Sequence, residues 1–223
     1  GETLSEQIFR QTKEFNEYLR EHPHDIDKWI EFAAFQERFV TVGGRPAPGA
    51  ADDKRIAVLQ AALRENDDDE QLLLAYLTAC QRRWEHNALE ALWRKILKQF
   101  SDSAHLWLTY LSFRAGNFTA FTVASQRVLY ADAVSHLVEA RKYAKSDHDV
   151  RHLETATLSV LVKYCVFEKQ AGYIERATGV LQALIEYNLF RPSFEKYDNP
   201  MDEFGLFWDS EAPRIGDDKA VGW

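Results

Sequence analysis

Apolar positions along the chain recur with the spacing expected of helices that bury one aromatic face. Two stretches carry aromatic residues three apart: Trp29, Phe32 and Phe35, and then Trp107, Tyr110 and Phe113. Residues three, four and seven apart lie on one face of an α-helix, so each triplet forms a flat stripe that can pack against a neighbouring helix. This spacing predicts helix packing rather than catalysis.

Weaker versions of the same stripe occur twice more, at Leu73, Tyr76 and Cys80 and at Leu161, Tyr164, Phe167 and Glu168. The four leading positions are 29, 73, 107 and 161, which gives steps of 44, 34 and 54 residues. Steps of 34 to 44 residues are typical of helix-pair repeats, and the long last step requires an extended helix or an insertion. The pattern therefore predicts a stack of helical hairpins.

Local signals place the individual helices. Residues 3–21 carry Ile8, Phe15 and Leu19 on one side, and His22-Pro23 ends that helix. Further helices are expected over 52–66 and 86–100, and the run 117–145, which has no Pro or Gly, is expected to hold the longest helix or two fused helices. We expect short acceptors at Asp25 and in Ser101-Asp102-Ser103 to begin helices. Apolar residues in the last helix before Phe190 are expected to pack on the fourth stripe: Ile174, Ala177, Leu181, Leu184 and Ile185.

Composition and charge narrow the classes of function. The chain has 223 residues, is 46% apolar and 28% charged, and carries a net charge of −8. A net negative charge opposes a sequence-independent grip on nucleic acid, which depends on Lys and Arg displacing phosphate counterions. The densest basic segment runs from Arg82 to Lys98, and its candidate RNA contacts are Arg83, Arg94, Lys95 and Lys98. A solvated helix face is the simpler explanation of the same residues.

No motif that carries chemistry is complete. Residues 41–51 are rich in Gly and Pro but lack the pattern of a phosphate loop, so we expect a flexible connector. The acidic run 67–70 lacks the alternation of a calcium loop, and its charge is better explained by the start of a helix. His148 and His152 stand four apart without the Glu of a zinc motif. We expect no enzyme activity, no cofactor and no metal.

Two further features bear on context. The chain has two cysteines, Cys80 and Cys165, far apart in apolar helical patterns, which indicates buried thiols in a reducing compartment rather than a disulfide framework. No apolar run approaches the length of a membrane span, and no signal peptide is evident. Gly1 is not an initiator Met, so we expect the chain to be a piece of a longer protein.

Specific stretches resemble a known family. The turn Pro23-His24-Asp25 before the Trp29 stripe resembles half-a-tetratricopeptide (HAT) repeats, which form α-superhelices in RNA-processing proteins. The segment from Phe15 to Gln36 resembles the start of the repeats in the nuclear RNAi-defective (NRDE) family. The tail from Phe207 to Trp223 resembles that family's WDSE-PRIG…GW segment.

This resemblance implies a nuclear scaffold in RNA surveillance, splicing fidelity and, in some lineages, small-RNA-directed silencing. The implied partners are the DExH-box RNA helicase of the nuclear exosome pathway and splicing or exon-junction factors, with no membrane. Whether RNA is bound directly or only through these proteins stays open. Helicase contact in the family is attributed to a segment before the repeats and to a basic low-complexity region. Neither is recognisable in this sequence.

The tail is the strongest candidate site. Trp208 is expected to anchor a partner, Asp209 and Glu211 to accept hydrogen bonds, and Arg214 to offer a planar fork to a carboxylate or phosphate. The alternative is structural: Trp208 and Ile215 close the end of the stack, while Asp209 and Arg214 fix a turn around Pro213.

The sequence thus predicts an all-α solenoid of HAT or TPR-like helical hairpins over residues 1–190, and the start of a further repeat over 191–223. The predicted function is non-enzymatic docking of proteins. Two alternatives stay open: a direct RNA-binding module, and a generic tetratricopeptide-type adaptor that holds peptides.

Overall fold

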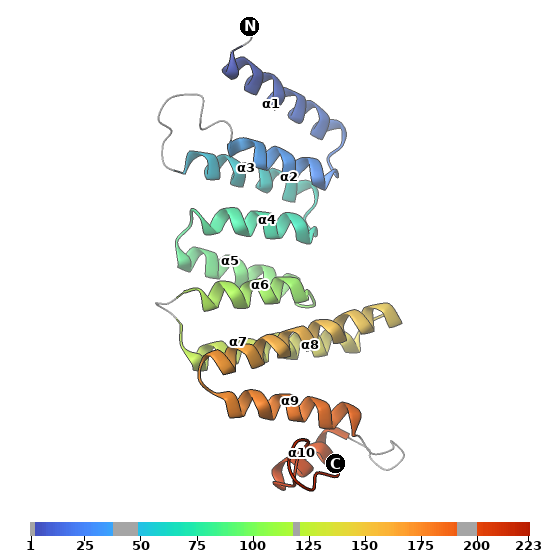
Figure 1. Ribbon diagram of the computed structural model, residues 1–223. Coiled ribbons are helices and arrows are strands. Elements are labelled where there is room, and N and C mark those ends of the chain that lie inside the picture. The colour runs from blue at the N-terminus through green and yellow to red at the C-terminus, as the bar shows by residue number, and fades with distance from the viewer. Residues whose placement is uncertain (1–2, 38–48, 118–120, 191–199) are drawn as a thin grey trace. The chain divides into compact units, whose positions relative to one another are not determined.

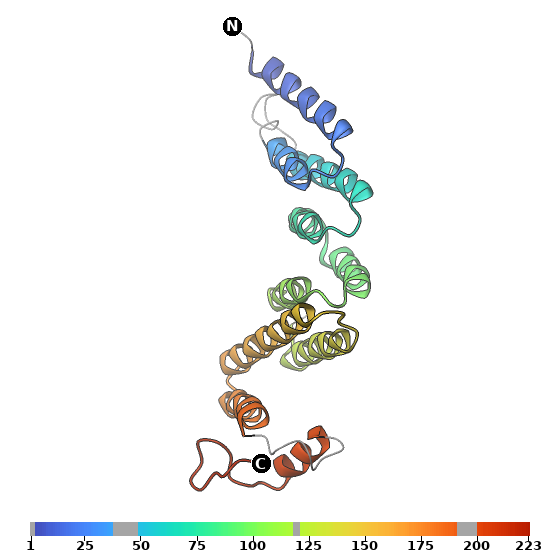
Figure 2. The same cartoon turned by 90° about the vertical axis from the view of Figure 1, so that its right-hand side faces the viewer.

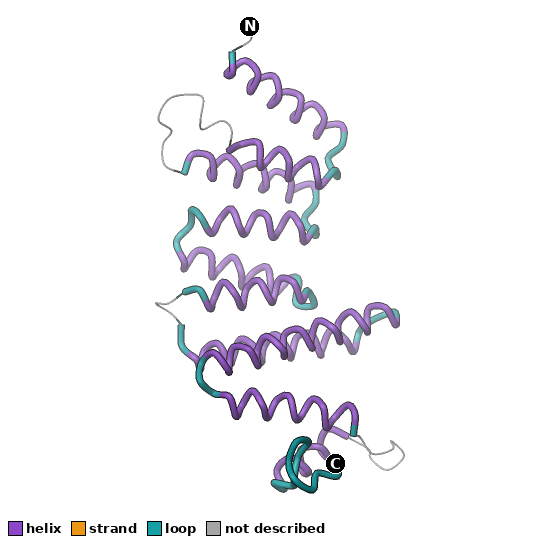
Figure 3. The backbone as a smooth tube through the Cα atoms, in the orientation of Figure 1, coloured by secondary structure: helices purple, strands orange, loops and turns teal. Residues whose placement is uncertain are grey.

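The computed structural model describes residues 3–37, 49–117, 121–190 and 200–223, and all regular structure in these ranges is helical (Figures 1 and 3). Within each of the two compact units, most successive helices pack against one another. This arrangement confirms the all-α class and the stacking of helical hairpins. The assignment to HAT repeats stays a prediction.

The first compact unit covers residues 1–100. Its helices are α1 (Leu4–Glu21), α2 (Ile26–Phe35), α3 (Ala50–Glu65), α4 (Glu70–Gln81) and α5 (His86–Gln99). Most of the loop expected over 41–51 lies outside the described residues. The second stripe is confirmed as one buried face of α4, made of Leu73, Tyr76 and Cys80.

Aromatic packing joins α1 to α2. The Phe15 ring stacks on the Phe32 ring with centroids 4.9 Å apart and lies 5.4 Å from the Phe35 ring. Ile8 and Leu19 complete this cluster, as the α1 pattern predicted. Aromatic side chains bury more apolar surface than most aliphatic ones. This stripe therefore contributes much of the hydrophobic free energy that stabilises the first hairpin.

The second compact unit covers residues 101–223. Its helices are α6 (Ala104–Ala115), α7 (Val123–Lys142), α8 (Asp147–Gln170), α9 (Ile174–Leu189) and α10 (Pro200–Asp209). Figures 1 and 2 show α7 and α8 side by side along their length. The predicted boundary between 190 and 191 borders the undescribed segment 191–199, so the domain division stays a prediction.

The tryptophan that begins each strong stripe makes the same kind of hydrogen bond. Trp29 Nε1 donates to the Pro23 carbonyl at 2.9 Å, and Trp107 Nε1 donates to the Ser101 carbonyl at 2.9 Å. In both cases the acceptor lies six residues earlier, in the turn that precedes the helix. The recurrence of this bond supports the view that the two stripes occupy equivalent positions in a repeated hairpin.

Helix lengths correct one expectation. The longest helix in the described part of the chain is α8, with 24 residues, whereas α7 begins only at Val123 and has 20. A Thr122–Ser125 capping box fixes the start of α7, so the absence of Pro and Gly upstream does not extend it. Two long helices in succession do account for the 54-residue step. The fourth stripe packs against α7. The centroid of the Tyr130 ring lies 5.3 Å from that of Tyr164 and 5.6 Å from that of Phe167.

Helix starts follow the expected capping chemistry. The side chains of Asp25, Asp69 and Ser103 accept hydrogen bonds from the backbone N–H groups of Lys28, Leu72 and Leu106. Asp69 is thus the N-cap of α4, which accounts for one member of the acidic run 67–70. Glu70 lies in the first turn of α4, where the helix dipole favours negative charge, whereas Asp67 and Asp68 precede the N-cap.

Candidate partner-binding surfaces

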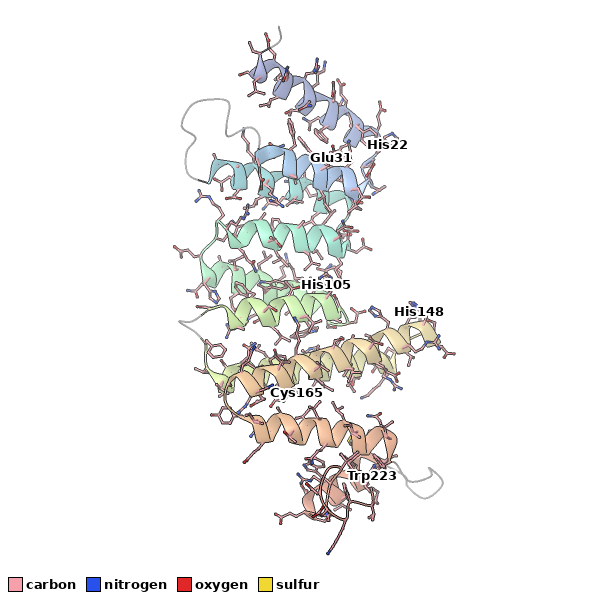
Figure 4. All side chains as sticks on the ribbon, viewed as in Figure 1. His22, Glu31, His105, His148, Cys165 and Trp223 are labelled. Carbon is pink, nitrogen blue, oxygen red and sulfur yellow. The ribbon has the colours of Figure 1, made fainter. Side chains whose placement is uncertain are left out.

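After α10 the chain returns across α9 as a strap, residues 210–223. The Gln182 side chain donates to the Ile215 carbonyl at 2.8 Å, and the Ile215 N–H donates to Oε1 of Glu186 at 2.6 Å. Trp223 Nε1 donates to the Glu186 carbonyl at 3.0 Å, and its ring stacks on Tyr187 with centroids 5.8 Å apart. Figure 4 shows Trp223 against this end of the unit. The strap is therefore fastened to α9 at several points.

Trp208 of α10 contacts Arg214 of the strap. The Arg214 guanidinium lies 3.7 Å from the centroid of the Trp208 ring, and its Nη2 donates to the Trp208 carbonyl at 3.1 Å. The turn after Pro213 is closed by Asp217, whose Oδ2 accepts from the Arg214 N–H at 2.9 Å. Asp217 therefore performs the turn-fixing role that the sequence suggested for Asp209.

These contacts agree with the structural alternative for the tail, since Trp208 and Ile215 both lie against α9. The Trp208 ring lies beside Gly179 of α9, where an added Cβ would be in ordinary van der Waals contact with it at 3.9 Å. Asp209 and Glu211 are exposed and stay available to a partner. The binding role of the four tail residues stays a prediction.

The basic segment is partly neutralised. Arg83 makes two hydrogen bonds to the Asp53 carboxylate, at 2.8 and 3.2 Å, and Arg94 pairs with Glu90 at 3.1 Å. Lys95 and Lys98 are exposed. Cations already bound to carboxylates release few phosphate counterions, which weakens the case for direct RNA binding here.

One buried ion pair organises the second unit. Glu168 is fully buried and accepts from Nε and Nη2 of Arg127 at 2.6 and 2.7 Å. These hydrogen bonds hold the pKa of Glu168 below its usual value and raise the pKa of Arg127. The Arg127 guanidinium also lies 4.4 Å from the centroid of the Tyr173 ring. The ion pair links α7 to the C-terminal end of α8, so its role is to stabilise the fold.

The residues considered for metal or thiol chemistry are His148, His152, Cys80 and Cys165. His148 and His152 are exposed, and His148 lies at the outer end of α8 (Figure 4). Within the described ranges no group of three or more His, Cys, Asp or Glu side chains could hold a metal ion. Both cysteines are free and buried, and burial raises the pKa of Cys80 to about 11, opposite to the shift that a nucleophile needs.

The structure reveals an apolar groove that the sequence patterns did not predict. It has a volume of about 640 Å³, and it lies where the C-terminal half of α9 meets α7 and α8. Its apolar lining is Val138, Leu158, Leu161, Leu184, Ile185 and Leu189.

The groove shows that one expectation about α9 is wrong. Ile174, Leu181 and Ile185 were expected to pack on the fourth stripe, but their exposed fractions are 60%, 44% and 37%. The cause is that α9 is held from two opposite sides. Ala177 is buried on the side toward α8, while Glu186, half a helical turn around, is buried under the strap. The flank between these sides stays uncovered, and it carries the apolar residues.

The α8 side of this region is also apolar and exposed. Leu158, Val162 and Val166 have exposed fractions of 51%, 47% and 50%. Their spacing of four residues would have revealed a second apolar stripe on α8, separate from Leu161 and Tyr164. Contiguous apolar surface is a mark of interaction sites, so this region is the candidate partner-binding surface.

Comparisons with known proteins agree with the tail and repeat motifs. A protein-family model described as "NRDE-2, necessary for RNA interference" matches residues 10–223. Similar curated proteins include "Nuclear exosome regulator NRDE2" of Mus musculus, 32% identical across 95% of this chain and 19% of the relative. The human protein of that name is 30% identical across 95% of this chain and 20% of the relative. "Protein NRDE2 homolog" of Schizosaccharomyces pombe is 25% identical across 99% of this chain and 25% of the relative.

The chain thus spans between about a fifth and a quarter of the length of these relatives. The family match covers both predicted landmarks, the Trp29 hairpin and the tail from Phe207 to Trp223. On this evidence the chain belongs to the NRDE-2 family.

Proposed function

We propose that this chain is a non-enzymatic docking platform for proteins of nuclear RNA surveillance. The observation that carries the proposal is the uncovered apolar groove between α7, α8 and α9, which is lined by Leu158, Ile185 and Leu189. Curated relatives named nuclear exosome regulators support the pathway and a nuclear location. Splicing fidelity and small-RNA-directed silencing are finer roles that the family resemblance suggests.

Several features favour protein over RNA as the ligand. The net charge of −8 opposes phosphate binding, and Arg83 and Arg94 are engaged by carboxylates. Within the described residues no helix is both long and apolar enough to cross a bilayer. Apolar side chains of a partner are the natural occupants of an apolar groove.

The experiment is affinity capture on the immobilised 223-residue chain from nuclear extract, with and without RNase, followed by mass spectrometry. Retention of exosome-linked helicase or splicing proteins after RNase treatment is the expected result. The matched control is the heat-denatured chain on the same support. If all bound proteins are lost with the RNA, the docking proposal is wrong, and salt-dependent RNA binding through Lys95 and Lys98 becomes the function to test.

A further inference from the structure

We call three exposed apolar residues of α8 and three of α9 the seam. It consists of Leu158, Val162 and Val166 on α8 and Leu181, Ile185 and Leu189 on α9. The turn at Gly172, with φ of 89°, reverses the chain between the two helices, so they run antiparallel. Leu158, Ile185 and Leu189 line the same groove, which places the end of one stripe beside the end of the other.

The seam residues repeat at intervals of four on each helix, so each set forms a ridge along its helix. The groove that contains Leu158, Ile185 and Leu189 is also lined by Val138 and Arg141 of α7. An amphipathic helix with apolar residues at i, i+3, i+4 and i+7 packs into an apolar groove of this kind.

Between its ends the seam offers little to a polar ligand. On α8 its edge carries Thr155 and Ser159, whose hydroxyls donate to the backbone carbonyls of Arg151 and Thr155 at 2.8 Å each. On α9 the Thr178 hydroxyl donates to the Ile174 carbonyl at 3.0 Å. These hydroxyl donors are already used, so recognition along the seam depends on apolar contact.

Charge appears at the two ends of the α8 stripe. Arg151 stands seven residues before Leu158, and Lys169 stands seven residues after Val162, so both lie on the face of α8 that carries the seam. A rise of 1.5 Å per residue puts them about 27 Å apart along the axis. Both are exposed, and neither belongs to an ion pair found in the described part of the chain. The nearby Glu154 is already bound by Arg141 at 2.6 Å.

We propose that the seam binds one amphipathic helix of a partner protein, about five turns long, with an acidic residue near each end. The proposal rests on the protein-docking function above and adds the chemistry of the partner. Acidic residues at the two ends meet Arg151 and Lys169, while the apolar face fills the groove.

The charges at the two ends of the seam also argue against two other occupants, a second copy of this chain and a nucleic acid. If two copies of this chain paired through their seams in antiparallel fashion, Arg151 of each would meet Lys169 of the other. In parallel pairing each cation would meet its own counterpart. Like charges face each other in both arrangements, which disfavours self-association. Two cations about 27 Å apart on an apolar strip are too few to hold a nucleic acid backbone.

The test uses two fluorescein-labelled 18-residue peptides with capped ends and the same Leu spacing of three, four and seven. One carries two Glu residues at each end, and the other carries two Lys residues there. Fluorescence anisotropy with the whole 223-residue chain measures the affinities at 50 and 500 mM NaCl. We expect the Glu peptide to bind at least tenfold more tightly at low salt, and the preference to shrink at high salt.

Matched variants assign the binding to the seam. The double variant Leu158→Ser/Val162→Ser is expected to lose at least tenfold in affinity. The control Val128→Ser replaces an exposed valine of α7, outside the seam, and is expected to lose none. Arg151→Glu with Lys169→Glu is expected to reverse the preference between the peptides. Lys163→Glu, on another face of α8, is the charge control.

Three outcomes overturn the proposal. These are failure of both peptides to bind, binding that ignores the end charges, and binding that survives the Leu158/Val162 substitutions while circular dichroism shows a folded chain. A dimer seen by light scattering that disappears in the same variant would identify a second copy as the occupant. Extract capture that persists beside a failed peptide assay would refute the helix partner and leave the docking function intact.

Discussion

Two adjacent aliphatic residues on α7 test whether burial is distributed as the structure describes. Leu137 is completely buried, whereas its neighbour Val138 has 43% of its surface exposed and lines the groove. Replacing Leu137 with Ala removes three carbon groups from the core, and at about 0.8 kcal/mol each the transfer cost is about 2.4 kcal/mol. The cavity left behind raises the expected loss of unfolding free energy to about 3–5 kcal/mol.

Val138→Ala removes two carbon groups that are only about half buried, which costs about 1 kcal/mol. The better helix propensity of Ala offsets roughly half of that cost. For a unit of this size 1 kcal/mol corresponds to a shift of about 3–6 °C in Tm. We therefore expect Leu137→Ala to lower the Tm of the second unit by at least about 9 °C, and Val138→Ala to change it by less than about 3 °C.

Differential scanning calorimetry of the whole chain is the suitable assay, because two compact units can melt separately and the transition that moves identifies the unit affected. Urea unfolding followed by circular dichroism provides an independent free energy. Equal shifts for the two variants, or a larger shift for Val138→Ala, would mean that α7 is rotated relative to this description. The groove would then be lost as well.

Three further predictions concern other parts of the chain. Glu168→Gln should destabilise the second unit at pH 7, because it removes the carboxylate that binds Arg127. Hydrogen bonds from Arg127 hold the folded pKa of Glu168 below its unfolded value of about 4.3, so its contribution to stability is present above that pH and is lost as the pH falls through the folded pKa. The urea midpoints of wild type and variant should therefore differ at neutral pH and begin to converge only below about pH 4.3. Cys80 and Cys165 should react with Ellman's reagent at pH 8 only after unfolding, since both are buried, and fast reaction in native buffer would contradict their placement. Trp208→Ala should expose the strap to limited proteolysis while the melting of the first unit stays unchanged, and an unaltered digestion pattern would show that the strap is held without the Trp208 contact.

Helix identity followed from sequence because it depends on local chemistry. The capping side chains of Asp25, Asp69 and Ser103 and the period of the aromatic stripes are properties of short segments. The start of α7 was harder to predict, because a Thr122–Ser125 box without Gly or Pro is a weak signal. The absence of helix breakers permits a long helix but does not require one.

The side to which each apolar residue turns was less predictable, because it depends on contacts between distant segments. Ile185 and Ala177 both satisfy a helical apolar pattern, yet only Ala177 is buried, since the strap occupies the Glu186 side of α9. The strap itself is positioned by Ile215 and Trp223, which lie 29 and 37 residues from Glu186. No local pattern reports a contact at that separation.

The same arrangement explains how the strap covers one flank of α9 and leaves an apolar flank beside it. On the covered flank the Ile215 N–H donates to Oε1 of the buried Glu186 carboxylate, and the Trp223 ring stacks on Tyr187. A strap built only for closure would gain more by lying over Leu181 and Ile185, because burying two half-exposed aliphatic residues contributes about 1–2 kcal/mol more than leaving them in water. Instead, it crosses a buried carboxylate that has to be compensated. The open flank is therefore not explained by stability, and this is the physical reason to place partner binding on the seam rather than on the Trp208 tail.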